Sequence, residues 1–283
     1  MRIGIIGAEG KLGSHLIHMG CEPLPVWIEK DMPWVDFPTK DAVIINCAAM
    51  TEVDRCETDE EYYKQAAQSN GWGVEYLAKA YAGEIIHIST DYVFGGRHGA
   101  YDERYSFDKH ENDLPAKNMA YGFTKFFGEC TAMLYNNVRI VRTTGLYGGI
   151  SPKNDFLNMI IDGYSIGVPE ILVTKELRGN QTYIPHLAEA LIQYAKMCAN
   201  GSQNPKVLHI ASKEVISRYE FALMIADVFG LDKKKIKPCR NKDVPGWVAE
   251  RPKKGGLKVK LAQKMGLPIY TILEGLQDAK KHG

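Results

Sequence analysis

The sequence predicts an α/β fold in which a parallel sheet is wound on both faces by helices. Short apolar runs rich in β-branched residues alternate with helical patterns through the first half of the chain, as in the strand–helix–strand units that build parallel sheets. A glycine-rich turn joins the first of these runs to the first helical pattern. The 283 residues, of which 45% are hydrophobic, suffice to bury one large core or two modest ones.

The glycine-rich turn predicts a dinucleotide-binding site. An apolar run at residues 2–6 ends at Gly7, and a helical pattern then continues to Met19. Gly7 permits the tight turn, Gly10 lets the backbone approach a pyrophosphate, and Gly13 lets the helix pack closely on the strand. The helix N-terminus offers N–H groups and a positive dipole end to the phosphates. Because the spacing is G-x-x-G-x-x-G, we expect the short-chain dehydrogenase/reductase variant of this Rossmann-like site.

Two later segments extend the predicted cofactor site. A second strand is expected at 24–28, and Glu29 and Lys30 follow it, about twenty residues past the glycines. An acid there binds the adenosine ribose hydroxyls and a base suits a 2′-phosphate, so the choice between NAD and NADP stays open. A buried strand at 42–46 runs into small residues at 47–51, at the carboxyl end of a parallel strand, where cofactors lie in doubly wound sheets.

The middle of the chain delivers polar side chains to the same edge of the sheet. A capping box at Thr58 begins a long helix, and Asn70 is expected to be a hydrogen-bonded structural residue on its buried face. A strand at 84–89 leads to Thr90. The stretch at 95–115 has no clear periodicity, and its length is typical of a functional lid or binding loop.

The second half of the chain has a less regular pattern and is expected to add a smaller, α-rich substrate-binding lobe. We place the dinucleotide-binding domain at 1–147, with return elements at about 179–212, and the lobe at 148–178 and 213–283. From residue 138 on, the pattern predicts strands at 138–141, 171–173 and 207–210, and helices at 156–161, 185–199, 217–229 and from 271.

A Tyr-x-x-x-Lys pair, Tyr121 and Lys125, lies in a segment predicted to be helical from Lys117 to Tyr135. Residues four apart lie on one face of a helix, so the hydroxyl and the ammonium can point into the same space. The ammonium stabilises the phenolate and lowers the phenol pKa from about 10 toward the working pH. With the Thr90 hydroxyl available to bind a substrate carbonyl, these residues are typical of carbonyl reduction by hydride from a nicotinamide cofactor.

Composition and charge argue against several other classes of protein. The formal net charge is +1, 24% of residues are charged, and no basic stripe is present, which argues against nucleic-acid binding. The six cysteines include no C-x-x-C pair, so neither a zinc site nor a disulfide framework is predicted, and reduced thiols fit the cytoplasm best. We recognise no signal peptide, no apolar run long enough to span a membrane, and no metal site.

Several stretches together resemble the dTDP-4-dehydrorhamnose reductase family of extended short-chain dehydrogenases/reductases. The resemblance covers nearly the whole chain and implies an NADPH- or NADH-dependent oxidoreductase of dTDP-rhamnose biosynthesis. Such an enzyme reduces the C4 ketone of a nucleotide-linked 4-keto-6-deoxysugar, as in dTDP-4-dehydrorhamnose to dTDP-L-rhamnose, and a homodimer is compatible with it. The matching stretches are 7–13, 46–57, 89–94 and 121–129, with looser matches at 142–144 and 250–252.

The resemblance also implies roles for individual residues. Tyr121 protonates the ketone oxygen as hydride arrives, while Lys125 lowers the tyrosine pKa and holds the nicotinamide ribose. Thr90 and Asp91 position the sugar, and Arg251 is expected to face the diphosphate because a guanidinium suits phosphate oxygens. Family members line the cofactor site at positions matching Gly10, Lys11, Leu12, Asp36, Phe37, Ala49, Met50 and Thr51, which join Gly7, Gly13 and Glu29.

One departure from the family leaves the sugar open. The family usually has a tryptophan two residues after Thr143, taken to pack on the sugar, and Gly145 stands there instead. Without that aromatic wall, another nucleotide-sugar reductase or epimerase of the superfamily is an alternative. A non-catalytic NADP-binding regulatory subunit is a second alternative, because that of methionine adenosyltransferase resembles the same family. Thr90, Tyr121 and Lys125 favour an enzyme.

Overall fold

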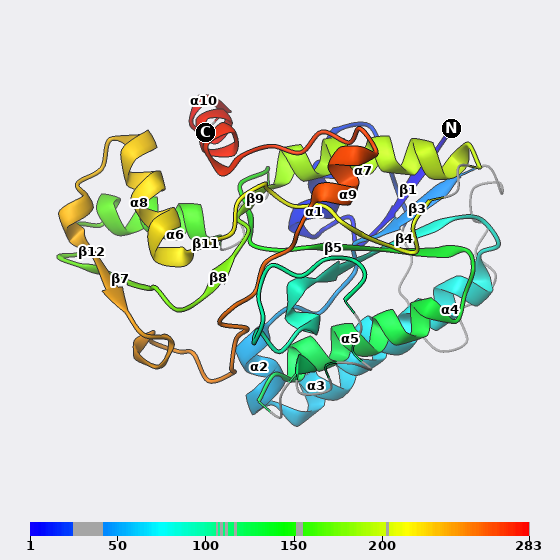
Figure 1. Ribbon diagram of the computed structural model, residues 1–283, viewed down its shortest axis with the longest axis horizontal. Coiled ribbons are helices and arrows are strands. Elements are labelled where there is room, and N and C mark those ends of the chain that lie inside the picture. The colour runs from blue at the N-terminus through cyan, green and yellow to red at the C-terminus, as the bar shows by residue number, and fades with distance from the viewer. Residues whose placement is uncertain are drawn as a thin grey trace.

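The computed structural model describes residues 1–24, 42–105, 107, 110, 113–115, 118–150, 155–201 and 204–282. The strand expected at 24–28 lies outside these residues apart from Leu24, and so do Glu29, Asp36 and Phe37. Within the described chain a six-stranded parallel sheet forms the centre of the larger part of the molecule (Figure 1). The predicted α/β fold with a doubly wound parallel sheet is therefore confirmed.

The order of strands in the sheet is β10-β5-β4-β3-β1-β2. The winding reverses between β1 and β3, because the chain moves outward to β2 on one side and through β3 and β4 on the other. Ile6 of β1 is the register partner of Asn46 in β3, which brings the glycine turn beside the block 47–51 at the reversal. Ligands bind at such a reversal. The strands are β1 (Ile3–Ile6), β2 (Glu22–Pro23), β3 (Val43–Asn46), β4 (Ile85–Thr90), β5 (Val138–Thr143) and β10 (Val207–His209).

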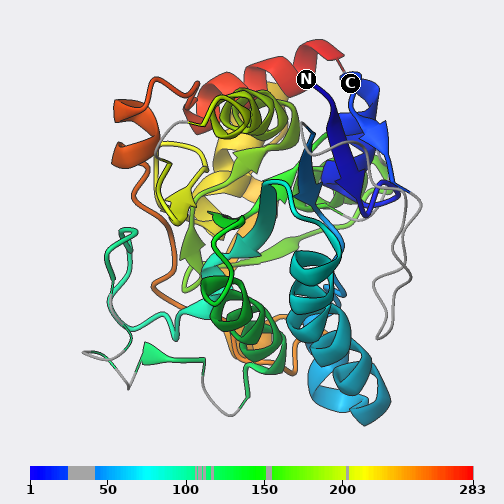
Figure 2. The ribbon, with the colours of Figure 1, turned by 90° about the vertical axis from the view of Figure 1, so that its right-hand side faces the viewer.

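Helices cover both faces of this sheet, and Figures 1 and 2 show the resulting layers. Ile5 and Ile45 pack against α1 and α7 on one face. Ile6 and Ile44 pack with α4 on the other face, since successive side chains of a strand point to opposite sides. A sheet buried on both faces explains why its strands are continuous apolar runs. The covering helices are α1 (Lys11–His18), α7 (Ile184–Ala199), α3 (Glu60–Ala67), α4 (Gly73–Ala80) and α5 (Ala120–Met133).

The long helix predicted from Thr58 is interrupted twice, and its predicted capping box is wrong. Thr58 ends a short helix, α2 (Val53–Thr58), and the next helix is capped by the Asp59 carboxylate, which accepts a hydrogen bond from the N–H of Tyr62. A five-residue π-helix, η1 (Gln68–Trp72), then separates α3 from α4. Capping by a residue one position later keeps the helix but shifts its start.

A second, smaller core lies at one end of the sheet and is built by α6, α8, α10 and short paired strands (Figure 1). The helices predicted to start at 217 and 271 each begin with a capping box, at Ser217 and Thr271. Residues of α9 and the turn after it pack instead into the core of the sheet. The elements are β6 (Leu146–Tyr147), α6 (Phe156–Ser165), β7 (Ile171–Thr174), β8 (Arg178–Gly179), β9 (Thr182–Tyr183), β11 (Ile216–Ser217), α8 (Arg218–Phe229), β12 (Ile236–Cys239), α9 (Lys260–Lys264) and α10 (Ile272–His282).

A buried ion pair ties β5 to α5. The Arg142 guanidinium donates two hydrogen bonds to Glu129, at 2.8 Å from Nε and 2.5 Å from Nη2, and both side chains are 4% exposed. The hydroxyl of Ser89 on β4 donates to the same carboxylate at 2.5 Å. This network fixes how α5 lies on the sheet.

No helix of the described chain is both long and apolar enough to cross a membrane.

We predict that Arg142→Met strongly destabilises the fold, because it leaves the Glu129 carboxylate buried without its counter-charge. Removal of one partner of a buried pair costs about 3–5 kcal/mol of unfolding free energy. Urea denaturation measures the change. Arg240→Met is the matched control, since its pair with Asp243 is exposed to solvent, where water and salt screen the charges and the pair contributes little to stability. Equal losses in the two variants would contradict the prediction.

Candidate functional site

Four of the predicted site residues line one cavity of about 170 Å³ at the carboxyl ends of β4 and β5. They are Thr51, Thr90, Asp91 and Tyr121, and they come from three separate motifs of the sequence. The cavity also touches Arg218, the first residue of α8, and the helix that follows packs in the smaller core. Its other lining residues are Val53, Tyr92, Thr144, Gly145, Leu177, Arg178, Gly179, Gln181 and Arg218.

Tyr121 reaches this cavity from the first turn of α5. The Glu57 carboxylate accepts a hydrogen bond from the N–H of Ala120, which satisfies one free donor at the start of the helix. A Cβ at Gly122 would lie 2.3 Å from the carbonyl oxygen of Tyr92, so only glycine lets α5 begin this close to the 3-10 turn Asp91–Val93 that follows β4. The Tyr121 ring then packs edge-on against Tyr92, with ring centroids 5.7 Å apart.

Lys125 lies one turn further along α5 and is 2% exposed. Its ammonium donates a hydrogen bond of 2.8 Å to the carbonyl oxygen of Ile88 on β4. Burial lowers the pKa of Lys125 to about 8, against the opposing effect of the neighbouring Glu129 and Cys47. A lysine with this pKa is mostly protonated at neutral pH and titrates just above it.

The expected lowering of the Tyr121 pKa is wrong for this structure. Burial of the phenol raises the pKa of Tyr121 above its usual value, and the nearby Tyr92 and Asp91 raise it further. The Lys125 ammonium is instead directed to the Ile88 carbonyl. Tyr121 therefore keeps its proton at neutral pH, which suits a group that donates a proton.

Thr90 and Asp91 lie where β4 ends, and each is engaged by its neighbours. The Thr90 hydroxyl donates to Asp91 at 3.4 Å and accepts from the N–H of Tyr92 at 3.3 Å. The Asp91 carboxylate also accepts from the N–H of Gly256 at 3.1 Å, and burial raises its pKa. Asp91 thus holds the segment around Gly256 against the site, while Thr90 lines the cavity.

The glycine turn has the geometry that its spacing predicts. Gly7 has a φ of +79°, and a Cβ there would lie 2.6 Å from the backbone nitrogen of Ala48. A Cβ at Gly13 would lie 2.1 Å from the Gly7 carbonyl oxygen, so this glycine allows the close packing of α1 on the turn. A Cβ at Gly10 would meet only that same oxygen, at 3.3 Å, and α1 begins at the next residue without a side-chain cap. The turn therefore leaves open space beside a helix N-terminus, as a pyrophosphate site requires.

Asn70 positions the second cofactor segment, and its role exceeds what the sequence suggested. Its side-chain oxygen accepts from the N–H of Met50 at 2.9 Å, and its amide donates to the Met50 carbonyl and to the Thr124 hydroxyl, both at 3.0 Å. Asn70 is fully buried in the π-helix η1. It links the block 49–51 to α5 at Thr124, the residue just before Lys125. A polar residue on an apolar helix face, followed by Gly71, was the available signal.

Arg251 lies beside a neighbouring cavity of about 740 Å³, not in the cavity of Tyr121. Its Nη1 donates to Asp54 at 3.0 Å, and its guanidinium stacks on Trp247 with 3.8 Å from Cζ to the ring centroid. Asp54 is thus its ion-pair partner in the structure.

Arg218 lines the Tyr121 cavity and was not predicted from the sequence, because the start of a helix gives no signal about the direction of a side chain.

The backbone around position 145 explains why glycine occurs there. Its φ is +60°, and a Cβ there would lie 2.2 Å from the carbonyl oxygen of Asn180. The strand pair β6–β9 thus closes the space that an aromatic side chain would need at this position.

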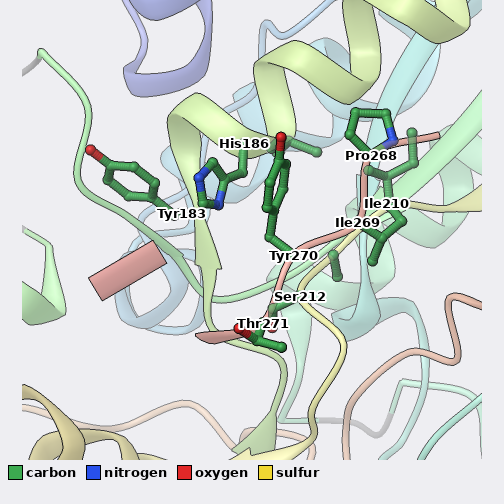
Figure 3. Close-up of a pocket in the computed structure, with 10 residues that line it drawn as sticks. Tyr183, His186, Ile210, Ser212, Pro268, Ile269, Tyr270 and Thr271 are labelled. Atoms are coloured by element: carbon green, nitrogen blue, oxygen red, sulfur yellow. The ribbon is translucent and has the colours of Figure 1, made fainter. Parts of the chain in front are cut away.

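A third cavity is shown in Figure 3 and has a volume of only about 10 Å³. Its His186 ring stacks on Tyr270 at 3.8 Å and meets Tyr183 edge-on at 5.1 Å. His186 also pairs with Asp278 at 2.9 Å, which seats α10 on α7. The cavity is a packing defect between the start of α7 and the segments 210–212 and 268–271. The described residues include no cluster of three or more His, Cys, Asp or Glu side chains that could hold a metal ion.

Comparison with known proteins identifies the family. The family model described as the RmlD substrate binding domain matches residues 33–282. The chain belongs to this family. A dTDP-4-dehydrorhamnose reductase of Mycolicibacterium smegmatis is 32% identical over 292 residues, covering 98% of this chain and 84% of that protein.

Solved structures of the same kind have this fold over the full chain. A dTDP-4-dehydrorhamnose reductase of Clostridium acetobutylicum is 29% identical, with a TM-score of 0.80 over 100% of this chain and 99% of that one. One of Bacillus anthracis, in complex with NADP, is 26% identical, with a TM-score of 0.81 over 100% and 99%. Membership of the RmlD family confirms the resemblance that the sequence motifs indicated.

We predict that Asn70→Leu destabilises the protein, because it removes the partner of the half-buried N–H and carbonyl of Met50 and of the buried Thr124 hydroxyl. Each such group costs about 1–3 kcal/mol of unfolding free energy, so a loss of at least about 2 kcal/mol is expected by urea denaturation. The control is Gln68→Leu in the same π-helix, whose side chain makes an exposed bond of 3.4 Å to Tyr76. A stable Asn70→Leu protein would refute the role given to Asn70.

Proposed function

We propose that this protein reduces the C4 ketone of a nucleotide-linked 4-keto-6-deoxysugar with NADPH or NADH, as the name of its relatives describes. The observation that carries the proposal is the joint presence of Thr90 and Tyr121 in one cavity, with Lys125 buried one turn further along α5. The geometry of the glycine turn supports a dinucleotide at the reversal of the sheet. The alternative of a purely regulatory subunit leaves this arrangement unused.

The chain's own residues account for the proton and the orientation. A bound nicotinamide supplies the hydride, which adds to the carbonyl carbon. Tyr121, which keeps its proton at neutral pH, gives that proton to the carbonyl oxygen and completes the alcohol. The Thr90 hydroxyl would hold the carbonyl, and the Lys125 ammonium, which donates to the Ile88 carbonyl in this structure, would bind the nicotinamide ribose. Ala49, Met50 and Thr51 would line the cofactor beside the glycine turn.

The position of the cavity supports a division of the chain into a cofactor-binding part and a substrate-binding part. We keep the division into a dinucleotide-binding part at 1–147 and 179–212 and a substrate lobe at 148–178 and 213–283, with the addition that α9 packs on the sheet. Leu177 and Arg218 of the lobe line the cavity opposite Thr90 and Tyr121. The sugar would therefore bind between the two parts, as ligands commonly do at such junctions.

Gly145 favours a second candidate within the same chemistry. Because the backbone of Asn180 occupies the space of an aromatic wall, the sugar would contact Leu177 or Tyr92 instead. Another nucleotide-sugar reductase or epimerase is therefore the alternative to be tested with a panel of substrates.

We also propose a cytoplasmic location, since all six cysteines are free thiols, and a homodimer that covers the exposed Trp72 and Phe123.

We predict that Tyr121→Phe lowers turnover by about 10²–10⁴-fold, the usual contribution of a general acid. The ring and its packing on Tyr92 remain, so cofactor affinity should change little. The measurements are NADPH oxidation with a nucleotide 4-ketosugar and a fluorescence titration of the cofactor. Tyr135→Phe, just beyond the other end of α5, is the control and should keep full activity. Turnover near that of the wild type in Tyr121→Phe would sink the mechanism.

We predict that the affinity for NADPH falls as the pH rises above about 8. Lys125 has a pKa of about 8 in the free protein, and binding of a ribose hydroxyl favours its protonated form, so affinity is full below that pH and decreases above it. A charged donor contributes about 1 kcal/mol more than a neutral one, so the dissociation constant should rise about fivefold between about pH 7 and pH 10. The same titration with Lys125→Met should show weaker binding without this dependence. If the affinity of Lys125→Met for NADPH fell with rising pH as the affinity of the wild type does, the role of Lys125 would be contradicted.

A further inference from the structure

Arg218 is a cation of the Tyr121 cavity that the mechanism has not yet used. It is the first residue of α8, directly after the capping residue Ser217, and its side chain lines the cavity. The guanidinium lies over the ring of Phe156, with 4.7 Å from Cζ to the ring centroid. Stacking of this kind fixes the plane of a guanidinium and leaves the N–H groups at its edge available.

The carboxylate nearest in sequence to Arg218 is committed to other donors. Glu220 accepts from the N–H of Ser217 at 2.6 Å and from Nη1 of Arg178 at 3.2 Å. The first of these bonds belongs to the capping box of α8, so Glu220 holds the helix start in place. Arg178 is therefore neutralised and Arg218 is not.

Two other acids, Asp155, which attracts Lys11, and Asp91, which lines the cavity, accept hydrogen bonds from backbone N–H groups. Asp155 accepts from the N–H groups of Gly148 and Asn158, at 2.7 and 2.9 Å. Asp91 accepts from the N–H of Gly256 and attracts Arg218 only from a distance. Across the described parts of the chain, the Arg218 guanidinium makes no ion pair within 4.0 Å and no hydrogen bond. A cation in this state has its donors ready for an anion.

Two further cations flank Arg218 and strengthen the local positive potential. Lys11, in the cofactor turn, and Arg251, beside the larger cavity, both repel it electrostatically. Arg251 is compensated by Asp54, and Lys11 is attracted by Asp155. Arg218 thus interacts electrostatically with a cation of the predicted cofactor site and with a cation that lines the larger cavity.

We propose that Arg218 binds the diphosphate of the sugar nucleotide and thereby places the sugar in the Tyr121 cavity. This inference rests on the proposed function and assigns the diphosphate to Arg218 in place of Arg251, whose guanidinium is held by Asp54 and Trp247. A cavity of about 170 Å³ accommodates little more than the sugar, so the diphosphate lies at its mouth. The planar fork of a guanidinium binds two phosphate oxygens at once.

The test is calorimetric titration of the full-length protein with dTDP, thymidine and NADPH. Arg218→Met should weaken dTDP binding by about 10- to 100-fold, the effect of losing a charge-assisted, bidentate contact. Binding of thymidine, which has no phosphate, and of NADPH should stay within about threefold of the wild type. Arg218→Lys should restore part of the dTDP affinity, because it returns the charge without the fork.

Arg178→Met is the matched control, since Arg178 lines the same cavity but is paired with Glu220 and its side chain is 44% exposed. It should change dTDP binding by less than about threefold. Equal losses in the two variants would mean that any positive charge serves, and a parallel loss of NADPH affinity in Arg218→Met would assign the residue to the cofactor. Either result overturns the proposal, as does a wild type that binds no dTDP.

Steady-state kinetics separates this inference from the proposed function. With a nucleotide 4-ketosugar, Arg218→Met should raise KM by a factor similar to its loss of dTDP affinity and leave kcat within about threefold, because the contact exists in both ground and transition states. An active wild type with an unaffected Arg218→Met variant would refute only the role of Arg218. A wild type that binds dTDP and NADPH but oxidises no cofactor with any 4-ketosugar would refute the reductase and leave the anion site standing.

Discussion

Close approach of α5 to its neighbours is the constraint on which the site depends. A Cβ at Gly122 would lie 2.3 Å from the Tyr92 carbonyl oxygen, and one at Gly128 would lie 2.1 Å from that of Asn70. Any other residue at either position would push the helix away from β4 and η1. The Tyr121 hydroxyl would then leave the cavity, and the Lys125 ammonium would lose the Ile88 carbonyl. Two glycines inside one helix are a local cost of about 1 kcal/mol each, offset by this packing.

The same packing explains the electrostatics of the site. A phenol and an ammonium held this deep lose water, so the pKa of Tyr121 rises and that of Lys125 falls. Tyr121 is thereby a stable proton donor, and Lys125 titrates near physiological pH. Below them, the pair of Glu129 and Arg142 supplies buried charge that is fully compensated. Among the residues that line the Tyr121 cavity, Arg218 is a cation whose guanidinium has no carboxylate partner in the described parts of the chain.

Much of the fold could be predicted because it follows from local patterns. Continuous apolar runs in the sequence predicted the strands β1, β3, β4 and β5. The four-residue spacing of Tyr121 and Lys125 predicted that these two side chains share one face of a helix, and both lie in α5. Features set by distant contacts could not be predicted. Arg251 pairs with Asp54, which is 197 positions away, and the direction of the Arg218 side chain depends on Phe156. The N-cap at Asp59, in place of Thr58, could not be predicted because neighbouring polar residues can each serve as the N-cap of a helix.

Transfer of deuterium from the cofactor to the sugar tests the central claim most directly. The wild-type protein would be incubated with NADPH deuterated at the transferred position of nicotinamide C4 and with dTDP-4-keto-6-deoxy sugars. The product would then be examined by NMR spectroscopy and mass spectrometry. The account predicts a single deuterium, bound to C4 of the sugar and accompanied by stoichiometric oxidation of the cofactor. Oxidation of the cofactor with no deuterium at C4, or binding of both ligands with no transfer, would contradict it.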